Sequence, residues 1–407
     1  MDENKTEKPE NGSLRRLLEV LWVALRLGLT SFGGPIAHLG YFRDEYVVRR
    51  KWLDEHTYSD VVALCQILPG PASSQVGITV GIMRGGLLGG IVAWLGFTLP
   101  SAIALVVFAY GIGSLNVADA GWLHGLKIVA VPVVAQAVWG MARVLTPDKP
   151  RITLAIVAAI ATLAFAAAWT QVLVIVVAAL IGWRLLRSTQ AVPEIHVPAP
   201  VKRTHGIMAL VLLAVLLIGL PIAQQFAPGQ TLAVFDSFFR VGALVFGGGH
   251  VVLPLLQHEV VLPGWVTNDQ FLAGYGAAQA VPGPLFTFSA YLGVVMLPGS
   301  YAWLNGGLAL VAIFLPSFLF IIGGLRLWSA IRGHTSFQAA LRGVNAAVVG
   351  LLLAALYQPV WTSAVKTPAD FSLALALFGL LVFWRVPPWL LVVFAAIGGA
   401  ATALLVR

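Results

Sequence analysis

Long apolar blocks follow one another along almost the whole chain, separated by short polar turns. Examples are Ile152–Trp169, Val172–Leu186, Met208–Ile222, Leu373–Trp384 and Pro387–Val406. A helix that crosses a bilayer needs about 20 apolar residues, and these blocks reach or approach that length. They differ from the short alternating segments of a membrane strand barrel. The pattern predicts an all-α polytopic integral membrane protein with about ten to thirteen apolar segments, several of them half-length.

An unusual set of helix-breaking motifs occurs twice in the chain. Each copy has an arginine-led apolar stretch ending in glycines, then a glutamine followed by Pro-Gly-Pro, then a Leu-Pro-Ser motif. The first and second copies lie 213 to 216 positions apart: Arg26–Pro35 and Arg240–Gly249, Gln66–Pro71 and Gln279–Pro284, Thr98–Ser101 and Phe314–Ser317. Repeated breaks at membrane depth are typical of transporters built from internal repeats, with the binding site where the copies meet.

The repeats divide the chain into four parts. We expect a polar tail over residues 1–12, a first membrane repeat over 13–187, a Pro-rich linker over 188–204 and a second membrane repeat over 205–407. Proline and polar residues in the linker favour an extended chain.

The loops that correspond in the two repeats differ in charge. Arg43–Lys51 carries four basic residues, whereas Gln257–Asn268 carries no lysine or arginine. Basic loops lie on the cytoplasmic side, so the two loops are expected on opposite faces and the halves to form an inverted repeat. Arg15 and Arg16 also favour a cytoplasmic start. The segment Leu17–Phe42 then begins and ends on one side, which requires a helix pair that turns back at Phe32–Pro35.

Composition supports the membrane assignment and narrows the function. Only 10% of the 407 residues are charged and 59% are hydrophobic, against about 25% charged in soluble proteins. The net charge of +8 fits the positive-inside rule and also favours an anionic substrate. The single cysteine, Cys65, excludes an intramolecular disulfide framework. No phosphate-binding loop, metal-ligand motif or basic–aromatic pattern is found, so we expect no metal, no cofactor, no nucleic acid and no ATP-driven step.

The two Pro-Gly-Pro motifs are the first candidates for a binding site. A helix that begins just after such a break, at membrane depth, presents free backbone N–H groups and the positive end of its dipole. Serine and threonine hydroxyls follow and add donors, and a simple proline kink is the alternative. The predicted oxyanion-binding residues of these motifs are Pro69, Gly70, Pro71, Ser73, Ser74, Pro282, Gly283, Pro284 and Thr287.

The glycine breaks add backbone approach and nearby cations. Gly33, Gly34 and Gly248 allow the helix to break or another backbone to come close. Arg26 and Arg240 lie inside apolar stretches, where a guanidinium can hold a tetrahedral oxyanion by two hydrogen bonds. Their alternative role is to snorkel or to pair with a carboxylate.

Proton coupling needs groups that titrate, and the carboxylates Glu45 and Glu259 occupy matching positions in the repeats. His38 and His250 flank the glycine breaks and are further candidates. Weaker candidates for the substrate site are Gln66 and Gln279, which could donate to an oxyanion or tie the broken backbone together, and Lys127 in an apolar helix.

The motifs Phe32–Pro35, Gln66–Pro71 and Gln279–Pro284, with the second-half glycine run, resemble those of the chromate transporter (CHR) family in its long two-repeat form. The resemblance covers nearly the whole chain. It implies an inner-membrane carrier that expels chromate from the bacterial cytoplasm and confers resistance, with a relation to sulfate. Gly249 stands where the first copy has Pro35, so the second break departs from the pattern.

Together these observations predict a secondary active transporter of an oxyanion. The expected partners are chromate, with sulfate as an analogue, protons as the coupling ion and the lipid bilayer, and a homodimer is compatible with the sequence. The function expected first is chromate efflux across the inner membrane by alternating access, driven by the proton-motive force. The alternatives are an uptake carrier for sulfate or another oxyanion, an anion channel, and a membrane-embedded enzyme acting on a lipid phosphate.

Overall fold

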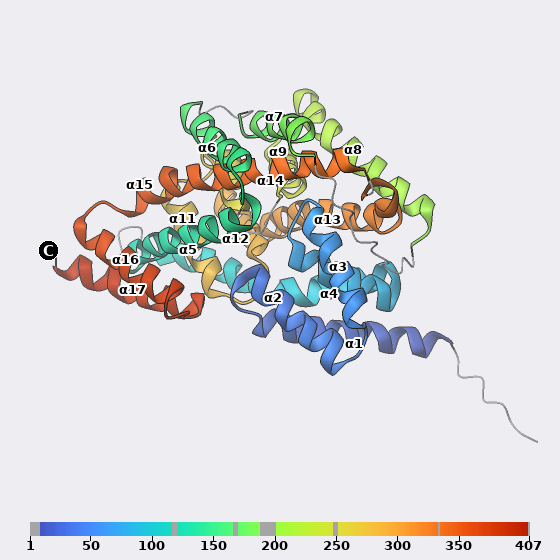
Figure 1. The fold of residues 1–407 in the computed structure, drawn as a ribbon. Coiled ribbons are helices and arrows are strands. Elements are labelled where there is room, and N and C mark those ends of the chain that lie inside the picture. Colours follow the sequence, from blue (N-terminus) through green and yellow to red (C-terminus); the bar gives the residue numbers. More distant parts are fainter. Residues whose placement is uncertain are drawn as a thin grey trace, which may run out of the picture.

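A computed structural model describes residues 9–115, 121–165, 170–187, 201–246, 251–332 and 334–405 (Figure 1). Every regular element in these ranges is a helix. The first half contains α1 (Pro9–Thr30), α2 (Gly34–Arg43), the π-helix η1 (Asp44–Arg49), α3 (Glu55–Ile67), α4 (Ala72–Leu115), α5 (Gly121–Leu145), α6 (Lys149–Ala164) and α7 (Thr170–Leu185). The second half contains α8 (Arg203–Phe226), α9 (Gln230–Leu244), α10 (Val252–Val260), α11 (Asn268–Ala280), η3 (Leu285–Thr287), α12 (Phe288–Met296), α13 (Ala302–Arg332), α14 (Thr335–Ala355), η4 (Leu356–Trp361), α15 (Thr362–Ala364), α16 (Pro368–Val382) and α17 (Pro388–Leu405).

The described part of the chain contains five helical stretches long and apolar enough to cross a membrane. They are Ala72–Ile112, Gly121–Leu145, Arg203–Phe226, Ala302–Leu325 and Thr335–Ala364, and shorter apolar helices accompany them. The predicted all-α polytopic membrane fold is confirmed, and so are the half-length helices.

The first hairpin runs out along α1 and returns along α2 and η1. Gly33 ends the outward arm with a φ of +97°, a left-handed conformation that favours glycine. Arg50, just after η1, reaches back to Glu19 of α1, with its Nη1 3.2 Å from the carboxylate. The returning arm therefore ends beside Glu19, and the chain turns back between α1 and α2, as the turn-back at Phe32–Pro35 predicted.

A second hairpin has the Pro-Gly-Pro motif at its tip. α3 ends at Ile67 and α4 begins at Ala72, and Cys65 Sγ lies 3.8 Å from Thr79 Oγ1 across the two arms. The returning arm is short, because Gly85 and Gly86 leave helical geometry and reverse the chain. A Cβ on Gly81 would lie 2.4 Å from the carbonyl oxygen of Gly89, so the segments 72–84 and 87–115 of α4 pack back to back.

The second half repeats this order from α9 onward. α11 ends at Ala280, the Pro-Gly-Pro motif follows, and η3 and α12 form the short returning arm. A Cβ on Gly293 of α12 would lie 2.4 Å from the carbonyl oxygen of Asn305 in α13. α12 and α13 therefore form the same tight pair as the two segments of α4.

The halves exchange their middle helices. α5 of the first half packs on α16 and α17 of the second, while α14 of the second half packs on α6 and α7 of the first. Glycines allow the contact in both places: a Cβ on Gly125 would lie 1.9 Å from the carbonyl oxygen of Ala395, and one on Gly343 2.0 Å from that of Ala178. Each half thus completes the core of the other.

The long helices α4 and α13 correspond in the repeats and run antiparallel to each other. The backbone N–H of Trp303, at the start of α13, donates to the hydroxyl of Tyr110 near the end of α4 (3.1 Å). Further along, Trp94 of α4 contacts Phe314 and Phe318 of α13, with ring centroids 5.6 and 5.8 Å apart.

The glycine contact between α5 and α17 should be essential for stability. Gly125→Val places a side chain against the backbone of α17 and should destabilise the protein by about 1–3 kcal/mol or more. Gly140→Val, in the same helix, is the control because nothing lies within 4 Å of its Cβ position. Thermal unfolding of both variants in detergent measures this; equal unfolding midpoints would contradict the packing.

Candidate functional site

One backbone hydrogen bond joins the tip of each Pro-Gly-Pro motif to the opposite half. The N–H of Gly70 donates to the carbonyl of Val245 (2.7 Å), and the N–H of Gly283 donates to the carbonyl of Ser31 (2.9 Å). Val245 and Ser31 stand at matching positions, each one residue past the end of the helix that precedes a glycine break. We call the Gly70 contact the first junction and the Gly283 contact the second junction.

Both junction glycines have left-handed backbones and face a serine from the other half. The φ angles are +120° for Gly70 and +96° for Gly283. A Cβ on Gly70 would lie 2.7 Å from the hydroxyl oxygen of Ser317, and one on Gly283 2.9 Å from that of Ser101. These serines end the two Leu-Pro-Ser motifs. Each junction therefore requires a glycine both for its conformation and for the space that it leaves.

The N-terminus of α4 follows directly after the first junction. Ser73 and Ser74 are buried in its first turn, and the ring Nδ1 of His38 lies 3.2 Å from the Ser73 hydroxyl. Gln75 closes the break by donating from Nε2 to the carbonyl of Pro69 (2.6 Å). The first-turn amides of α4 have no carbonyl within the helix to bond, so they can donate to an anion.

In the second half the corresponding hydroxyl is already used. Thr287 Oγ1 donates to the carbonyl of Pro284 (2.7 Å), which stabilises the break itself. The Pro-Gly-Pro break there is followed by a single 3₁₀ turn before α12. The helix start near the first junction is therefore the better donor array of the two.

Buried hydroxyls without a hydrogen-bond partner gather in the segments that form the junctions. Within the described residues there are five such hydroxyls, and four of them lie in these segments: Ser31, Ser74, Thr98 and Ser317; the fifth, Thr170, lies in α7. A buried hydroxyl that lacks a partner costs about 1–3 kcal/mol, so a ligand that accepts hydrogen bonds is stabilised there. Hydroxyls and helix N-terminal amides together can hold an oxyanion without a buried fixed cation.

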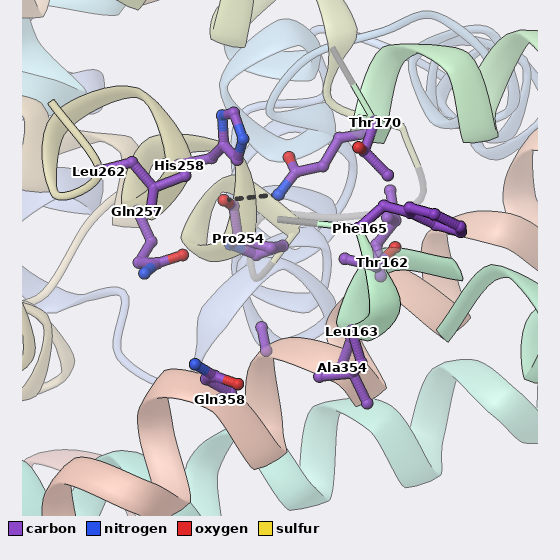
Figure 2. A pocket seen from close by; sticks show the side chains of 13 residues that line it. Thr162, Leu163, Phe165, Thr170, Pro254, Gln257, His258, Leu262, Ala354 and Gln358 are labelled. Carbon is purple, nitrogen blue, oxygen red and sulfur yellow. Dashed lines mark hydrogen bonds between the residues drawn. The ribbon is translucent and has the colours of Figure 1, made fainter. Parts of the chain in front are cut away.

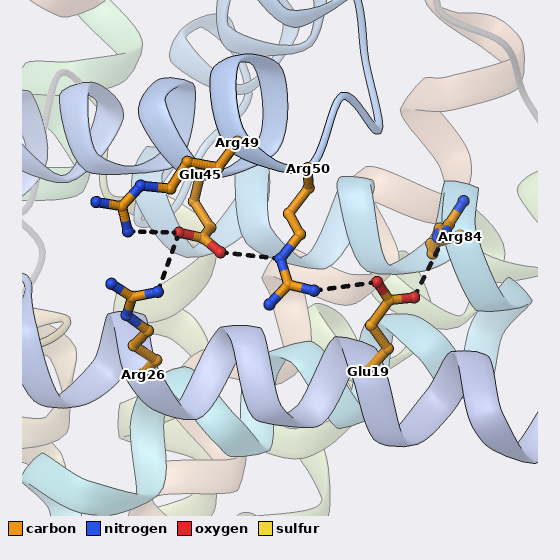
Figure 3. A network of polar contacts seen from close by, with 6 residues as sticks. All are labelled: Glu19, Arg26, Glu45, Arg49, Arg50 and Arg84. Carbon is orange, nitrogen blue, oxygen red and sulfur yellow. Dashed lines mark hydrogen bonds and ion pairs between the residues drawn. The ribbon is translucent and has the colours of Figure 1, made fainter.

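Arg26 lies in an ion-pair network on one face of α1 (Figure 3). The carboxylate of Glu45 is only 5% exposed and lies 3.7, 3.4 and 3.1 Å from Arg26, Arg49 and Arg50. Arg50 and Arg84 both pair with Glu19, at 3.2 and 3.3 Å. Four guanidinium groups thus surround two carboxylates, which leaves an excess of positive charge.

Arg240 lies in a smaller group with the opposite charge balance. Its guanidinium lies 3.1 Å from Asp236 and 3.0 Å from Glu259. Arg26 and Arg240 therefore each contact the matched glutamate of the same half. Both arginines therefore make the carboxylate pairing that the sequence offered as their alternative role. About half of the Arg26 side chain remains exposed.

The other predicted residues lie in different surroundings. Lys127 pairs with Asp269 of the second half at 3.2 Å. Gln66 is exposed, whereas the Nε2 of Gln279 is buried and without a hydrogen-bond partner. Gly33 and Gly34 form the tip of the first hairpin, and Gly248 and His250 lie outside the described residues. Pro69 and Pro71 are buried, while Pro282 is partly exposed.

A separate cavity of about 100 Å³ lies between α6, α7, α10 and the end of α14 (Figure 2). Its polar lining includes Thr170, Gln257 and Gln358, and Gln171 donates to the carbonyl of Pro254 (3.2 Å). The predicted site residues do not line it. No group of three His, Cys, Asp or Glu side chains in the described ranges could hold a metal ion.

Sequence reasoning missed several residues that the geometry brings forward. Ser101 and Ser317 end the repeated Leu-Pro-Ser motifs, and this repetition was the only signal for them. Their role was missed because the glycines that they face lie in the other half. Asp236 stands four residues before Arg240, a spacing that places both on one face of a helix. Gln75 lies within the helix start after the Pro-Gly-Pro motif and carried no separate signal.

Internal repeats, helices broken at membrane depth and reciprocal contacts between the breaks define a multi-pass membrane protein of the transporter class. The chain belongs to the chromate transporter family, because the family model described as "Chromate transporter" matches residues 18–183 and 232–400. α8 lies between the two matched ranges.

Full-length relatives support this membership. The chromate transport protein of Pseudomonas aeruginosa is 26% identical over 92% of this chain and 89% of its own. The probable chromate transport protein of Synechococcus elongatus is 27% identical over 95% of each chain. An uncharacterized transporter of Methanocaldococcus jannaschii is 26% identical over 86% of each. No solved structure matches the chain.

The junction contacts can be tested by a double substitution. Gly283→Ala should destabilise the protein by about 1–3 kcal/mol, because its methyl group meets the Ser101 hydroxyl and its φ is left-handed. Gly264→Ala shares the left-handed φ, +79°, but has nothing within 4 Å, so it should cost less. Adding Ser101→Gly should recover part of the Gly283→Ala loss in thermal unfolding. Strictly additive effects would mean that the two residues do not interact.

Proposed function

We propose that the protein is a secondary active transporter that exports chromate across the inner membrane by alternating access, coupled to the proton-motive force. The observation that carries the proposal is the pair of reciprocal junctions, in which each half closes its helix break on the other. Such paired breaks are the structural setting of substrate sites in carriers. The family of transporters to which the chain belongs, and the chromate named for its relatives, support chromate as the substrate.

The donor set near the first junction suits a tetrahedral dianion. The proposed chromate site consists of the free amides at the start of α4 with the hydroxyls of Ser74 and Ser317, and Ser31 of the second junction is proposed as a further donor. Chromate and sulfate both present four acceptor oxygens and two charges, so neutral donors and a helix dipole can bind either. Both arginines, Arg26 and Arg240, are paired with carboxylates, so neither is proposed as a direct ligand. Arg26, in the group with surplus positive charge, is proposed to attract the anion at long range, whereas the two carboxylates around Arg240 outweigh its charge.

An inverted repeat explains how the two halves are arranged in the membrane. The antiparallel course of the corresponding helices α4 and α13 supports it. The number of membrane crossings in the first half also supports the inverted repeat. Each of the two hairpins returns to its starting face, the segment 87–115 and α5 cross in opposite directions, and α6 and α7 form a pair that returns to its starting face. The first half therefore starts and ends on one face, and the single helix α8 carries the chain to the other before α9.

The distribution of charge fits the same topology. Basic residues collect at the helix ends that this path assigns to the cytoplasm: Arg84, Arg143, Lys149, Arg151, Arg184, Arg187, Lys202, Arg203, Arg342 and Arg385. Arg342, at the start of α14, donates to the carbonyl of Leu186 after α7 (2.8 Å), so these two ends lie together. On the opposite face, Lys127 pairs with Asp269 and His124 with Asp370 (2.8 Å).

Counterflow of chromate tests the transport mechanism. Purified protein in liposomes loaded with unlabelled chromate should take up labelled chromate transiently above equilibrium, because a carrier exchanges substrate across the membrane. A channel gives no such overshoot, and an enzyme gives no flux. Unlabelled sulfate on the inside should drive the same uptake if the site accepts both dianions. Absence of overshoot with either anion would overturn the proposal.

The inverted topology predicts opposite accessibility of two matching positions. Val48 and Leu262 stand at corresponding places in the two loops, 214 residues apart, and are 54% and 52% exposed. In a Cys65→Ser background, Leu262→Cys should react with an impermeant maleimide added outside intact cells. Val48→Cys should react only after the membrane is opened. Labelling of both from the same side would contradict the inverted repeat.

A further inference from the structure

We propose that Asp236 is the carboxylate that binds the coupling proton, an inference that rests on the proton coupling proposed above. Asp236 lies on α9 with its side chain only 3% exposed. One carboxylate oxygen, Oδ2, accepts a hydrogen bond from Arg240 at 3.1 Å, and the other, Oδ1, is buried without a hydrogen-bond partner.

The negative charge of Asp236 and its neighbour Glu259 is only partly compensated. Arg240 is shared between Asp236 and Glu259, so one guanidinium faces two carboxylates and the group carries an excess negative charge. Two carboxylates that share one site cannot both be charged at low energetic cost, particularly where water is excluded. Binding a proton removes the excess charge.

The elements packed against α9 bring no further ion to Asp236. α8 has no charged residue over 207–226, and α13 has none over 302–325. α10 contributes Glu259 and its neighbour His258, which has interactions of its own. Arg240 and Glu259 are therefore the charged groups that act on Asp236 within the described residues.

Between the two carboxylates, Asp236 is the better site for the proton. Glu259 is 19% exposed, so water stabilises its charge, and it accepts from the Nη2 of Arg240 at 3.0 Å. Asp236 is almost fully buried, and half of its hydrogen-bonding capacity is unused. Protonation therefore relieves a larger cost at Asp236 than at Glu259.

The corresponding group in the first half lacks these features. The position that matches Asp236 is Trp22, which is 63% exposed. Glu45, the match of Glu259, lies among three arginines that compensate its charge. The difference assigns proton binding to one half of the repeat and a surplus of cations to the other.

Full-length protein in liposomes can separate this inference from the coupling that it rests on. Two signals are followed at alkaline pH, where chromate carries two charges: labelled-chromate counterflow, and proton movement reported by a trapped pH dye when a chromate gradient is imposed. We expect the wild type to give both signals. Asp236→Asn should keep counterflow within about twofold and lose proton movement by about tenfold or more. Asp44→Asn, an exposed carboxylate, is the control and should match the wild type.

The Glu259→Gln variant tests the inference through the pH profile of chromate transport, which a purely structural role of Asp236 would leave unchanged. Removing the second carboxylate leaves Asp236 paired one-to-one with Arg240, so its charged form is stabilised. Proton movement should persist, and the pH profile of chromate transport should shift toward acid by about one pH unit. Loss of proton movement in Glu259→Gln with retention in Asp236→Asn would assign the proton to Glu259 and overturn the inference.

The other outcomes are also decisive. If Asp236→Asn moves protons like the wild type, the inference is wrong while proton coupling stands. If the wild type moves no protons with chromate, the coupling itself is wrong and Asp236 has no proton to carry. If Asp236→Asn loses counterflow as well, Asp236→Glu decides: recovery of both signals supports the inference, and recovery of counterflow alone or of neither overturns it.

Discussion

The need to satisfy backbone groups at the helix breaks around Gly70 and Gly283 governs this structure. A break inside a membrane leaves N–H and carbonyl groups that no water can reach, and each one costs free energy when it is left alone. The Gly70 and Gly283 amides meet this need by donating to carbonyls of the other half. Side chains of the same half satisfy the carbonyls of Pro69 and Pro284, but the Gly70 and Gly283 amides find their acceptors in the other half. The interface is therefore part of how the breaks are closed, as well as the place proposed for the binding site.

Reciprocal contacts of this kind fit the alternating access proposed above. Each junction is built from one hydrogen bond and a glycine–serine contact, and the two junctions are equivalent by the repeat. Packed interfaces of this type switch between discrete arrangements instead of deforming continuously.

Much of the architecture could be predicted from the sequence, since it depends on local chemistry. Proline and glycine mark the breaks at Gly33, Gly70 and Gly283, and hydropathy marks the helices. The same-side return of the first hairpin followed from charge. The exchange of α5 and α14 between halves could not be predicted, because it depends on which glycine faces meet across 165 residues (Gly343 and Ala178) and 270 residues (Gly125 and Ala395). Asp236 was missed for a similar reason: its unpartnered oxygen and its sharing of Arg240 with Glu259 exist only after α9 and α10 pack.

The exchange of helices has a consequence for how the protein is made. Gly125 contacts Ala395, which is synthesised 270 residues later. At about 5–20 residues per second, α5 leaves the ribosome on the order of 15–50 seconds before its partner α17 exists. During that interval its glycine-lined face can only be covered by lipid or by an insertion factor. The core around α5 is thus completed only once α17 has been made, and a chain released before α17 would leave the first half without part of its core.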